Sequence, residues 1–194
     1  MPPGAYPIAY RFNPTPPMKK YLLAPFLGAL AMFVWGFFYY GVSGTPYEAL
    51  QPAQDVGPAL DKLFPESGAY IVPDPRMDPE AMTEKLAAGP FATVHIQKGG
   101  RPAMDAMVLL QGFALEFVSC LLLVVLLRLA QIRWYTTRLL FATLVGLLIT
   151  IYAQGGLVIW WHQDLGWHAR TIIHDVVAWF AAGAVIAGFA KPSD

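Results

Sequence analysis

The sequence has little charge and almost no cysteine. Only 13% of its 194 residues are charged, against roughly 25% in soluble globular domains, whereas 56% are hydrophobic. Thirteen cationic residues balance thirteen acidic ones, so no basic surplus is present to bind a nucleic-acid backbone. The one cysteine, Cys120, lies in an apolar run and cannot form an internal disulfide or a cysteine-based zinc site. The composition argues against a soluble enzyme and indicates a small integral membrane protein.

Four apolar runs are long enough to cross a hydrocarbon core of about 30 Å, because a helix rises about 1.5 Å per residue. They span residues 21–42, 106–127, 139–161 and 171–190. The first run exceeds the apolar part of a secretory signal, roughly 7 to 15 residues, and no small-residue cleavage site follows it, so we expect an uncleaved anchor. The sequence therefore predicts an all-α membrane protein built as a four-transmembrane-helix bundle.

Basic residues are distributed unequally between the two ends of these runs. One end carries seven cations and one acid, namely Arg11, Lys19, Lys20, Arg128, Arg133, Arg138, Lys191 and Asp194. The other end carries segment 43–104, with eight acids and five cations. Because short cytoplasmic flanks are enriched in Lys and Arg, both termini are predicted to be cytoplasmic. In a bacterium the protein would be a multi-pass protein of the inner membrane, and segment 43–104 would be periplasmic.

Segment 43–104 is predicted to form a small α+β extracytoplasmic cap between the first two membrane helices. The patterns indicate a helix over 55–64, a strand over 68–73, a helix over 78–88 and a strand over 91–97. Asp78 before Pro79 has the chemistry of a helix start. The two strands should pair antiparallel, and we expect the cap to lean on the membrane helices, because about 62 residues bury only a small core.

The chain is thus predicted to divide into five parts. These are an arm at 1–17, a membrane helix at 18–42, the cap at 43–104, three membrane helices in 105–190 and a cytoplasmic tail at 191–194. The arm holds six prolines and three aromatic residues and should be extended. Its candidate partner-contact residues are Tyr6, Tyr10, Arg11 and Phe12. Either another subunit holds this arm, or it folds back on its own helices.

Polar residues within the membrane runs are candidate functional groups, because an ionisable side chain there is energetically costly. Glu116 lies near the middle of the second run, about 15 Å from the outer surface, whereas Asp175 is expected at about 6 to 8 Å. The predicted outward-facing polar site comprises Glu116, Gln111, Gln154, His174 and Asp175. It could conduct protons, or hold a small polar ligand or a quinone head group. Alternatively, these residues satisfy one another and set the helix register.

Small residues at helical spacing predict close packing of the membrane helices. The three series are Gly28, Met32 and Gly36 in the first run, Ala178, Ala181, Ala182 and Val185 in the fourth, and the Gly155–Gly156 pair in the third.

Three histidines near the outer end, His162, His168 and His174, suggest a metal site only weakly, because their six-residue spacing differs from the i, i+3 or i+4 spacing of helical metal motifs. No nucleotide loop, metalloprotease motif or nucleophile elbow is present in the sequence. We therefore predict no catalytic residue, no metal and no cofactor for this chain.

Several stretches resemble a family of bacterial four-helix membrane proteins of unknown activity. They are FVWGFFYY (33–40), PESGAYIVPDP (65–75), GPFATVHIQ (89–97), Met104–Asp105 and IWWHQ (159–163). The resemblance covers most of residues 18–190 and implies a topology, but no reaction and no catalytic residue.

These observations lead to three hypotheses about function. The first is a non-catalytic accessory or structural subunit of a larger bacterial membrane complex, with a bioenergetic complex as the expected setting, in contact with lipid and with other membrane subunits but not with nucleic acid. The second is a stand-alone membrane protein that binds a small ligand or conducts protons around Glu116. The third and weakest is an enzyme that uses the outer histidines.

Overall fold

The structure is a computed structural model that describes residues 18–42, 56–100, 102 and 104–190. The predicted arm at 1–17, with Tyr6, Tyr10, Arg11 and Phe12, and the predicted tail at 191–194 lie outside the described residues.

Four long helices are long and apolar enough to cross a membrane, as predicted. They are α1 (Met18–Val42), α4 (Ala106–Leu129), α5 (Tyr135–Trp161) and α6 (Leu165–Phe189). In the most apolar 18-residue window of each helix, between 17% and 28% of residues are buried inside the protein. Most apolar side chains of these helices therefore face outward, where lipid is the solvent that accommodates them.

One helix boundary differs from the prediction in a way that matters for the site. The fourth apolar run was expected to form a helix from residue 171, but α6 begins at Leu165. The cause is a side-chain cap, because Asp164 Oδ1 accepts a hydrogen bond from the backbone N–H of Trp167 at 2.6 Å. The polar residues before the apolar run are thereby added to the helix.

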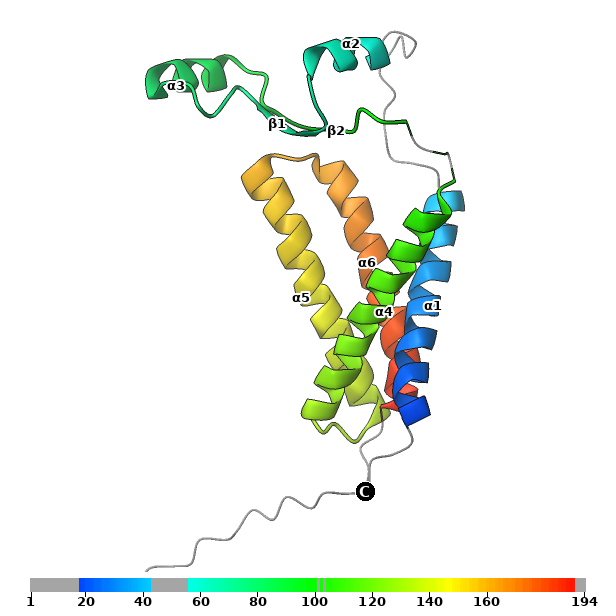
Figure 1. The fold of residues 1–194 in the computed structure, drawn as a ribbon. Coiled ribbons are helices and arrows are strands. Elements are labelled where there is room, and N and C mark those ends of the chain that lie inside the picture. The colour runs from blue at the N-terminus through cyan, green and yellow to red at the C-terminus, as the bar shows by residue number, and fades with distance from the viewer. Residues whose placement is uncertain (1–17, 43–55, 101, 103, 191–194) are drawn as a thin grey trace, which may run out of the picture.

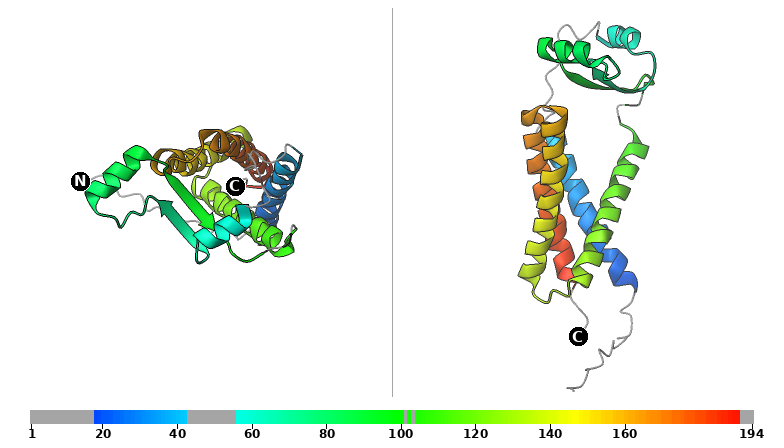
Figure 2. Two further views of the ribbon diagram at one scale, coloured as in Figure 1. Left: turned by 90° about the horizontal axis from the view of Figure 1, so that it is seen from above. Right: turned by 90° about the vertical axis from the view of Figure 1, so that its left-hand side faces the viewer.

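The four long helices pack as an open row in the order α5, α6, α1, α4 (Figures 1 and 2). Extensive contacts join α5 to α6, α6 to α1 and α1 to α4, whereas α4 makes few contacts with α5 or α6. Helix α6 thus has a packed neighbour on two sides, and it carries the longest series of buried small residues: Ala178, Ala182, Gly183 and Ala187.

Glycines allow the close contacts in this row. A methyl group at Gly28 of α1 would lie 2.8 Å from Ile186 of α6 and 3.2 Å from Cys120 of α4, and one at Gly183 of α6 would lie 2.8 Å from Ala142 of α5. The predicted packing role of Gly28 is confirmed. The predicted packing role of the Gly155–Gly156 pair is wrong, because a methyl group on either residue would meet no other helix of the described part of the chain within 4 Å.

A buried arginine joins the α4–α5 turn to the end of α6. Arg138 is 4% exposed, and its Nε donates to the carbonyl of Ala187 at 2.8 Å, while its Nη1 donates to the carbonyls of Ile132 and Arg133. These carbonyls lie near or beyond the ends of helices, where backbone oxygens lack partners within the helix. Arg138 is therefore a structural cation.

The segment between α1 and α4 forms a separate small unit, which we call the cap. It contains α2 (Val56–Leu63), β1 (Gly68–Val72), α3 (Pro79–Ala88) and β2 (Ala92–Ile96). The strands pair antiparallel with Gly68 opposite Ile96, as predicted. The predicted start of α3 is also confirmed, since Asp78 Oδ1 accepts from the backbone N–H groups of Glu80 and Ala81.

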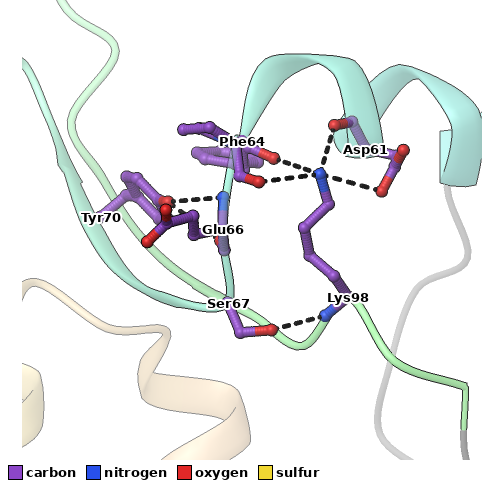
Figure 3. Close-up of polar contacts among 7 residues, drawn as sticks. Asp61, Phe64, Glu66, Ser67, Tyr70 and Lys98 are labelled. Atoms are coloured by element: carbon purple, nitrogen blue, oxygen red, sulfur yellow. Dashed lines mark hydrogen bonds and ion pairs between the residues drawn. The ribbon is translucent and has the colours of Figure 1, made fainter.

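A lysine holds α2 against the end of β2 (Figure 3). Lys98 Nζ donates to the carbonyls of Asp61, Phe64 and Pro65 at 2.9, 2.8 and 3.2 Å, and it lies 3.1 Å from the Asp61 carboxylate. A cation at this place satisfies the carbonyls at the end of the helix. Beside it, the buried ring of Phe64 packs on Tyr70 at a centroid distance of 4.7 Å.

The cap lies over the turn between α5 and α6 (Figure 1). An edge-to-face contact at 5.4 Å between Phe91, just before β2, and His162, in the turn, joins the two parts. We expected the cap to lean on the helices more broadly. Among the described residues, however, its elements make no extensive contact with any of the four long helices.

Candidate functional site

A chain of polar side chains runs from the α5–α6 turn into the bundle. It begins at Gln163 in the turn, whose Oε1 lies 2.8 Å from His168 Nε2. His168 Nδ1 lies 2.7 Å from Oε1 of Gln154 on α5, and Gln154 Nε2 donates to Asp175 Oδ2 at 3.2 Å. Asp175 Oδ1 then lies 2.9 Å from His174 Nδ1. Gln154 of α5 is thus bonded to two residues of α6, His168 and Asp175.

The hydrogen-bonding capacity of Gln154 sets the direction of these bonds. Its amide NH₂ donates to the Asp175 carboxylate, which accepts only, so its oxygen faces His168. His168 must then donate from Nδ1 to that oxygen. Because His168 is 2% exposed, this arrangement is shielded from water and holds Gln154 in one orientation.

His174 is held in place by its neighbours on three sides. Its Nδ1–H donates to Asp175, its backbone carbonyl accepts from Trp35 Nε1 at 3.0 Å, and the rings of Tyr39 and Tyr40 lie at centroid distances of 5.3 and 4.8 Å. A carboxylate that orients one ring nitrogen leaves the other nitrogen as the reactive one. In His174 that atom is Nε2, which is buried and has no hydrogen-bond partner within the described part of the chain.

Glu116 of α4 lies at the same level as His174. On the neighbouring turns, Cys120 Sγ lies 3.7 Å from Met32 Sδ. Helices α1 and α4 run in opposite directions (Figure 1), so one turn toward the cap from this contact brings Gly36 opposite Glu116. A methyl group at Gly36 would lie 3.3 Å from His174 Nε2. Glu116 of α4 and His174 of α6 therefore lie at the level of the same turn of α1.

The Glu116 carboxyl also has an unsatisfied atom. Its Oε2 is buried, and no described side chain or backbone group hydrogen-bonds to it. A buried polar atom without a partner is costly unless a proton, a water or a ligand satisfies it. Two such atoms, Glu116 Oε2 and His174 Nε2, lie at one level of the bundle. We call Glu116, His174 and Asp175 the acid–imidazole cluster.

The observed helix starts place Glu116 and His174 at similar depths in the bundle. The sequence alone indicated different depths for Glu116 and the polar residues of the fourth helix. The sequence predicts Asp175 well above Glu116, because it predicts a fourth helix that begins at residue 171. With α6 beginning at Leu165, His174 is the tenth residue of its helix, and Glu116 is the eleventh of α4. Both lie about 15 Å from the start of their helices.

The structure brings together most of the predicted site, but not all of it. Successive hydrogen bonds join Gln154, Asp175 and His174, and Glu116 lies at the level of His174 on α4. Gln111 is exposed on α4 and lies outside this chain of contacts.

His168 is the member of the site that sequence reasoning did not include. The missed signal is Asp164, which is a good N-cap residue three positions before Trp167. A helix that begins there places His168 and Asp175, seven residues apart, on one face.

The three histidines considered as metal ligands have separate environments. His162 packs on Phe91, His168 bonds to two glutamine side chains, and His174 bonds to Asp175. Within the described ranges, no group of three His, Cys, Asp or Glu side chains is placed to hold a metal ion.

Comparison with known proteins finds no matching family model, no matching curated protein and no matching solved structure. The resemblance to bacterial four-helix membrane proteins therefore stays a prediction.

Proposed function

We propose that this protein takes up and releases protons at the acid–imidazole cluster in the middle of its membrane-spanning region. The observation that carries the proposal is the pair of buried, unpartnered atoms, Glu116 Oε2 and His174 Nε2, at one level of the bundle. Both atoms can bind a proton, and His174 Nε2 lies beside Gly36 of α1, where a methyl group would approach it to 3.3 Å.

The chemistry follows from the bonds around His174. Because Nδ1–H donates to Asp175, a proton exchanged with Glu116 must arrive at Nε2. The two atoms are not hydrogen-bonded to each other, so the proposed transfer runs through a bridging water. When the proton moves from Glu116 to Nε2 by this route, the O–H bond of Glu116 breaks, an N–H bond forms at Nε2, and a neutral pair becomes a carboxylate and an imidazolium. The Asp175 carboxylate stabilises that imidazolium, which reduces the energy of separating charge within the membrane.

His168 and Gln154 position the cluster but do not carry its proton. An amide gives up a proton only through an unfavourable imidic acid form, so Gln154 interrupts any simple relay. Its role is to orient the Asp175 carboxylate toward His174 from α5, and His168 fixes the orientation of Gln154.

The test uses purified protein in liposomes that contain a pH-sensitive dye. Proton entry is driven by a potassium diffusion potential. We expect Glu116→Gln to lower the proton flux at least tenfold, whereas Glu84→Gln, the same change at an exposed residue of α3, leaves it unchanged. Equal flux in wild type and Glu116→Gln, or no flux above empty liposomes, would refute the proposal.

The proposed setting is the bacterial inner membrane, with both termini cytoplasmic and the cap periplasmic. It is supported by the distribution of Lys and Arg and by the position of the cap at the end opposite the α4–α5 turn (Figure 1). In a Cys120→Ala background, a membrane-impermeant maleimide should label Ser67→Cys in the cap and leave Thr136→Cys near the α4–α5 turn unlabelled in intact cells. Labelling of Thr136→Cys alone would reverse the orientation.

An accessory role in a larger membrane complex is the second candidate. It is favoured by the outer half of α5, where Gly155 and Gly156 line a groove of about 510 Å³ beside Tyr152 and Trp160, which are 85% and 78% exposed. Small residues on an outward face allow another membrane helix to approach closely.

This second candidate predicts a heavy particle after purification in a mild detergent. Gly156→Leu should reduce it to the free chain, and Gly112→Leu, an exposed glycine of α4, should not. Recovery of the wild type as a monodisperse monomer would refute this role.

A further inference from the structure

A pocket lies where the cap meets the α5–α6 turn. It has a volume of about 280 Å³, and both parts of the protein line it. The cap contributes Phe91, Ala92 and Thr93, and the turn with the first residues of α6 contributes residues 161–164, 167 and 168. Its volume approaches the range of about 300 to 1,000 Å³ that is typical of small-molecule sites.

The apolar part of this pocket is aromatic. Phe91 and Trp161, 38% and 46% exposed, present ring surface from opposite sides of the junction, and Trp167 adds a third ring. The edge-to-face contact of Phe91 with His162 connects the two sides. Flat aromatic surfaces at a junction favour a flat ligand that can stack on them.

The polar part of the pocket offers hydrogen bonds with little charge. Thr93 Oγ1 is buried and has no partner among the described residues. Gln163 lies beside it in the lining, bonded on one side to His168. Among the described residues, no Lys or Arg lines the pocket to bind an anion, and one oxygen of the Asp164 carboxylate is engaged as the cap of α6. The lining therefore suits a neutral ligand that forms hydrogen bonds at its edge.

We propose that this pocket binds a neutral hydroxyl-bearing aromatic ring, of the phenol or quinol class, stacked between Phe91 and Trp161 with its hydroxyl bonded to Thr93. The ring could come from water as a small phenol or from the membrane as an alkylated quinol, because the two share the recognised group. The proposal goes beyond the proton-binding function and shares with it only His168, which lines the pocket and also positions the cluster.

The test measures binding to the full-length protein by ligand-observed NMR. Phenol should bind saturably, and toluene, which has the same shape without the hydroxyl, should bind about tenfold more weakly. Thr93→Val keeps the side-chain shape but removes the hydroxyl, so it should weaken phenol binding about tenfold. Thr83→Val on α3, whose hydroxyl bonds to its own helix, should leave binding unchanged.

A separate variant, Trp161→Ala, tests whether the ligand ring stacks on Trp161. Trp161→Ala should weaken the binding of phenol and toluene alike, whereas Thr93→Val should affect phenol alone. Circular dichroism confirms that each variant keeps its helices. Equal binding of phenol and toluene, or phenol binding unchanged in both Thr93→Val and Trp161→Ala, would overturn the proposal, as would the absence of saturable phenol binding.

Two further measurements identify the source of the ligand and distinguish its binding from the function of the proton site. A decyl-substituted quinol in lipid nanodiscs that binds more tightly than phenol supports a membrane source, and the reverse order supports a soluble one. Glu116→Gln should keep phenol binding while it loses proton flux. Loss of phenol binding in Glu116→Gln would contradict the placement of the ligand at the junction.

Discussion

Replacing Gly146 with alanine should separate α5 from α6. A methyl group at Gly146 would overlap with Cβ and Cγ of Trp179 and would lie 3.0 Å from its Cδ1. Carbon atoms pack at about 3.5 to 4.0 Å, so the two helices must move apart by roughly 1 Å. The Cβ of Trp179 is fixed by the backbone of α6, so a rotamer change cannot relieve the clash. We expect a loss of about 1–3 kcal/mol in the free energy of unfolding, as for other overpacked sites.

The polar chain should loosen in the same variant. Gln154 lies two turns from Gly146 on α5, and its bond to Asp175 on α6 is already 3.2 Å long. A separation of roughly 1 Å at this interface weakens that bond below a useful strength. Proton flux in liposomes should therefore fall along with stability.

The assay is unfolding of the detergent-solubilised protein by increasing sodium dodecyl sulfate, followed by circular dichroism. Gly155→Ala is the matched control, because it is the same change in the same helix at a place where a methyl group meets no described residue within 4 Å. It should be neutral or stabilise by up to about 1 kcal/mol through helix propensity. If the two variants unfold alike, the close packing of α5 on α6 is wrong.

Two further predictions concern the cap. Hydrogen bonds from Arg76 to the Asp74 carboxylate lower the pKa of Asp74 from 3.8 to about 2; its contribution to stability is thus present above pH 3.8 and is lost as the pH falls toward 2. Carbon NMR of Arg76→Ala should show the Asp74 midpoint returning toward 3.8, and an unchanged midpoint would contradict this cause. Lys98→Met should destabilise α2 by about 1–2 kcal/mol, because three carbonyls lose a charged donor, and the change is measured as faster amide exchange in α2. Lys62→Met, at an exposed lysine of α2 itself, should exchange at the wild-type rate.

The sequence was sufficient to predict the helices and strands, and for many of them the face that packs, because these depend on local patterns. Four long apolar runs can only be helices in a membrane, where every backbone group needs an internal partner. Asp78 before Pro79 set the start of α3, and alternating residues set the strands of the cap. Small residues four apart on α1, such as Gly28, marked the face that packs.

Local patterns gave wrong predictions where they did not show which helix of the chain would pack on a residue. Gly155 and Gly156 have the composition of a packing face, yet no other described helix packs on them, because the row order places α6 on another side of α5. Gln111 shares a helix with Glu116 but is exposed, because α4 contacts α1 rather than α5.

The sequence by itself determined four helices that are long and apolar enough to cross a membrane, and the spacing of their polar residues limited which could meet. The tertiary structure decided which of them do. Asp164 starts α6 early enough to bring His174 to the level of Glu116 and to place His168 against Gln154. The physical reason is that burial and hydrogen bonding within a membrane depend on the depth and the neighbours of a side chain, and both are set by how whole helices pack.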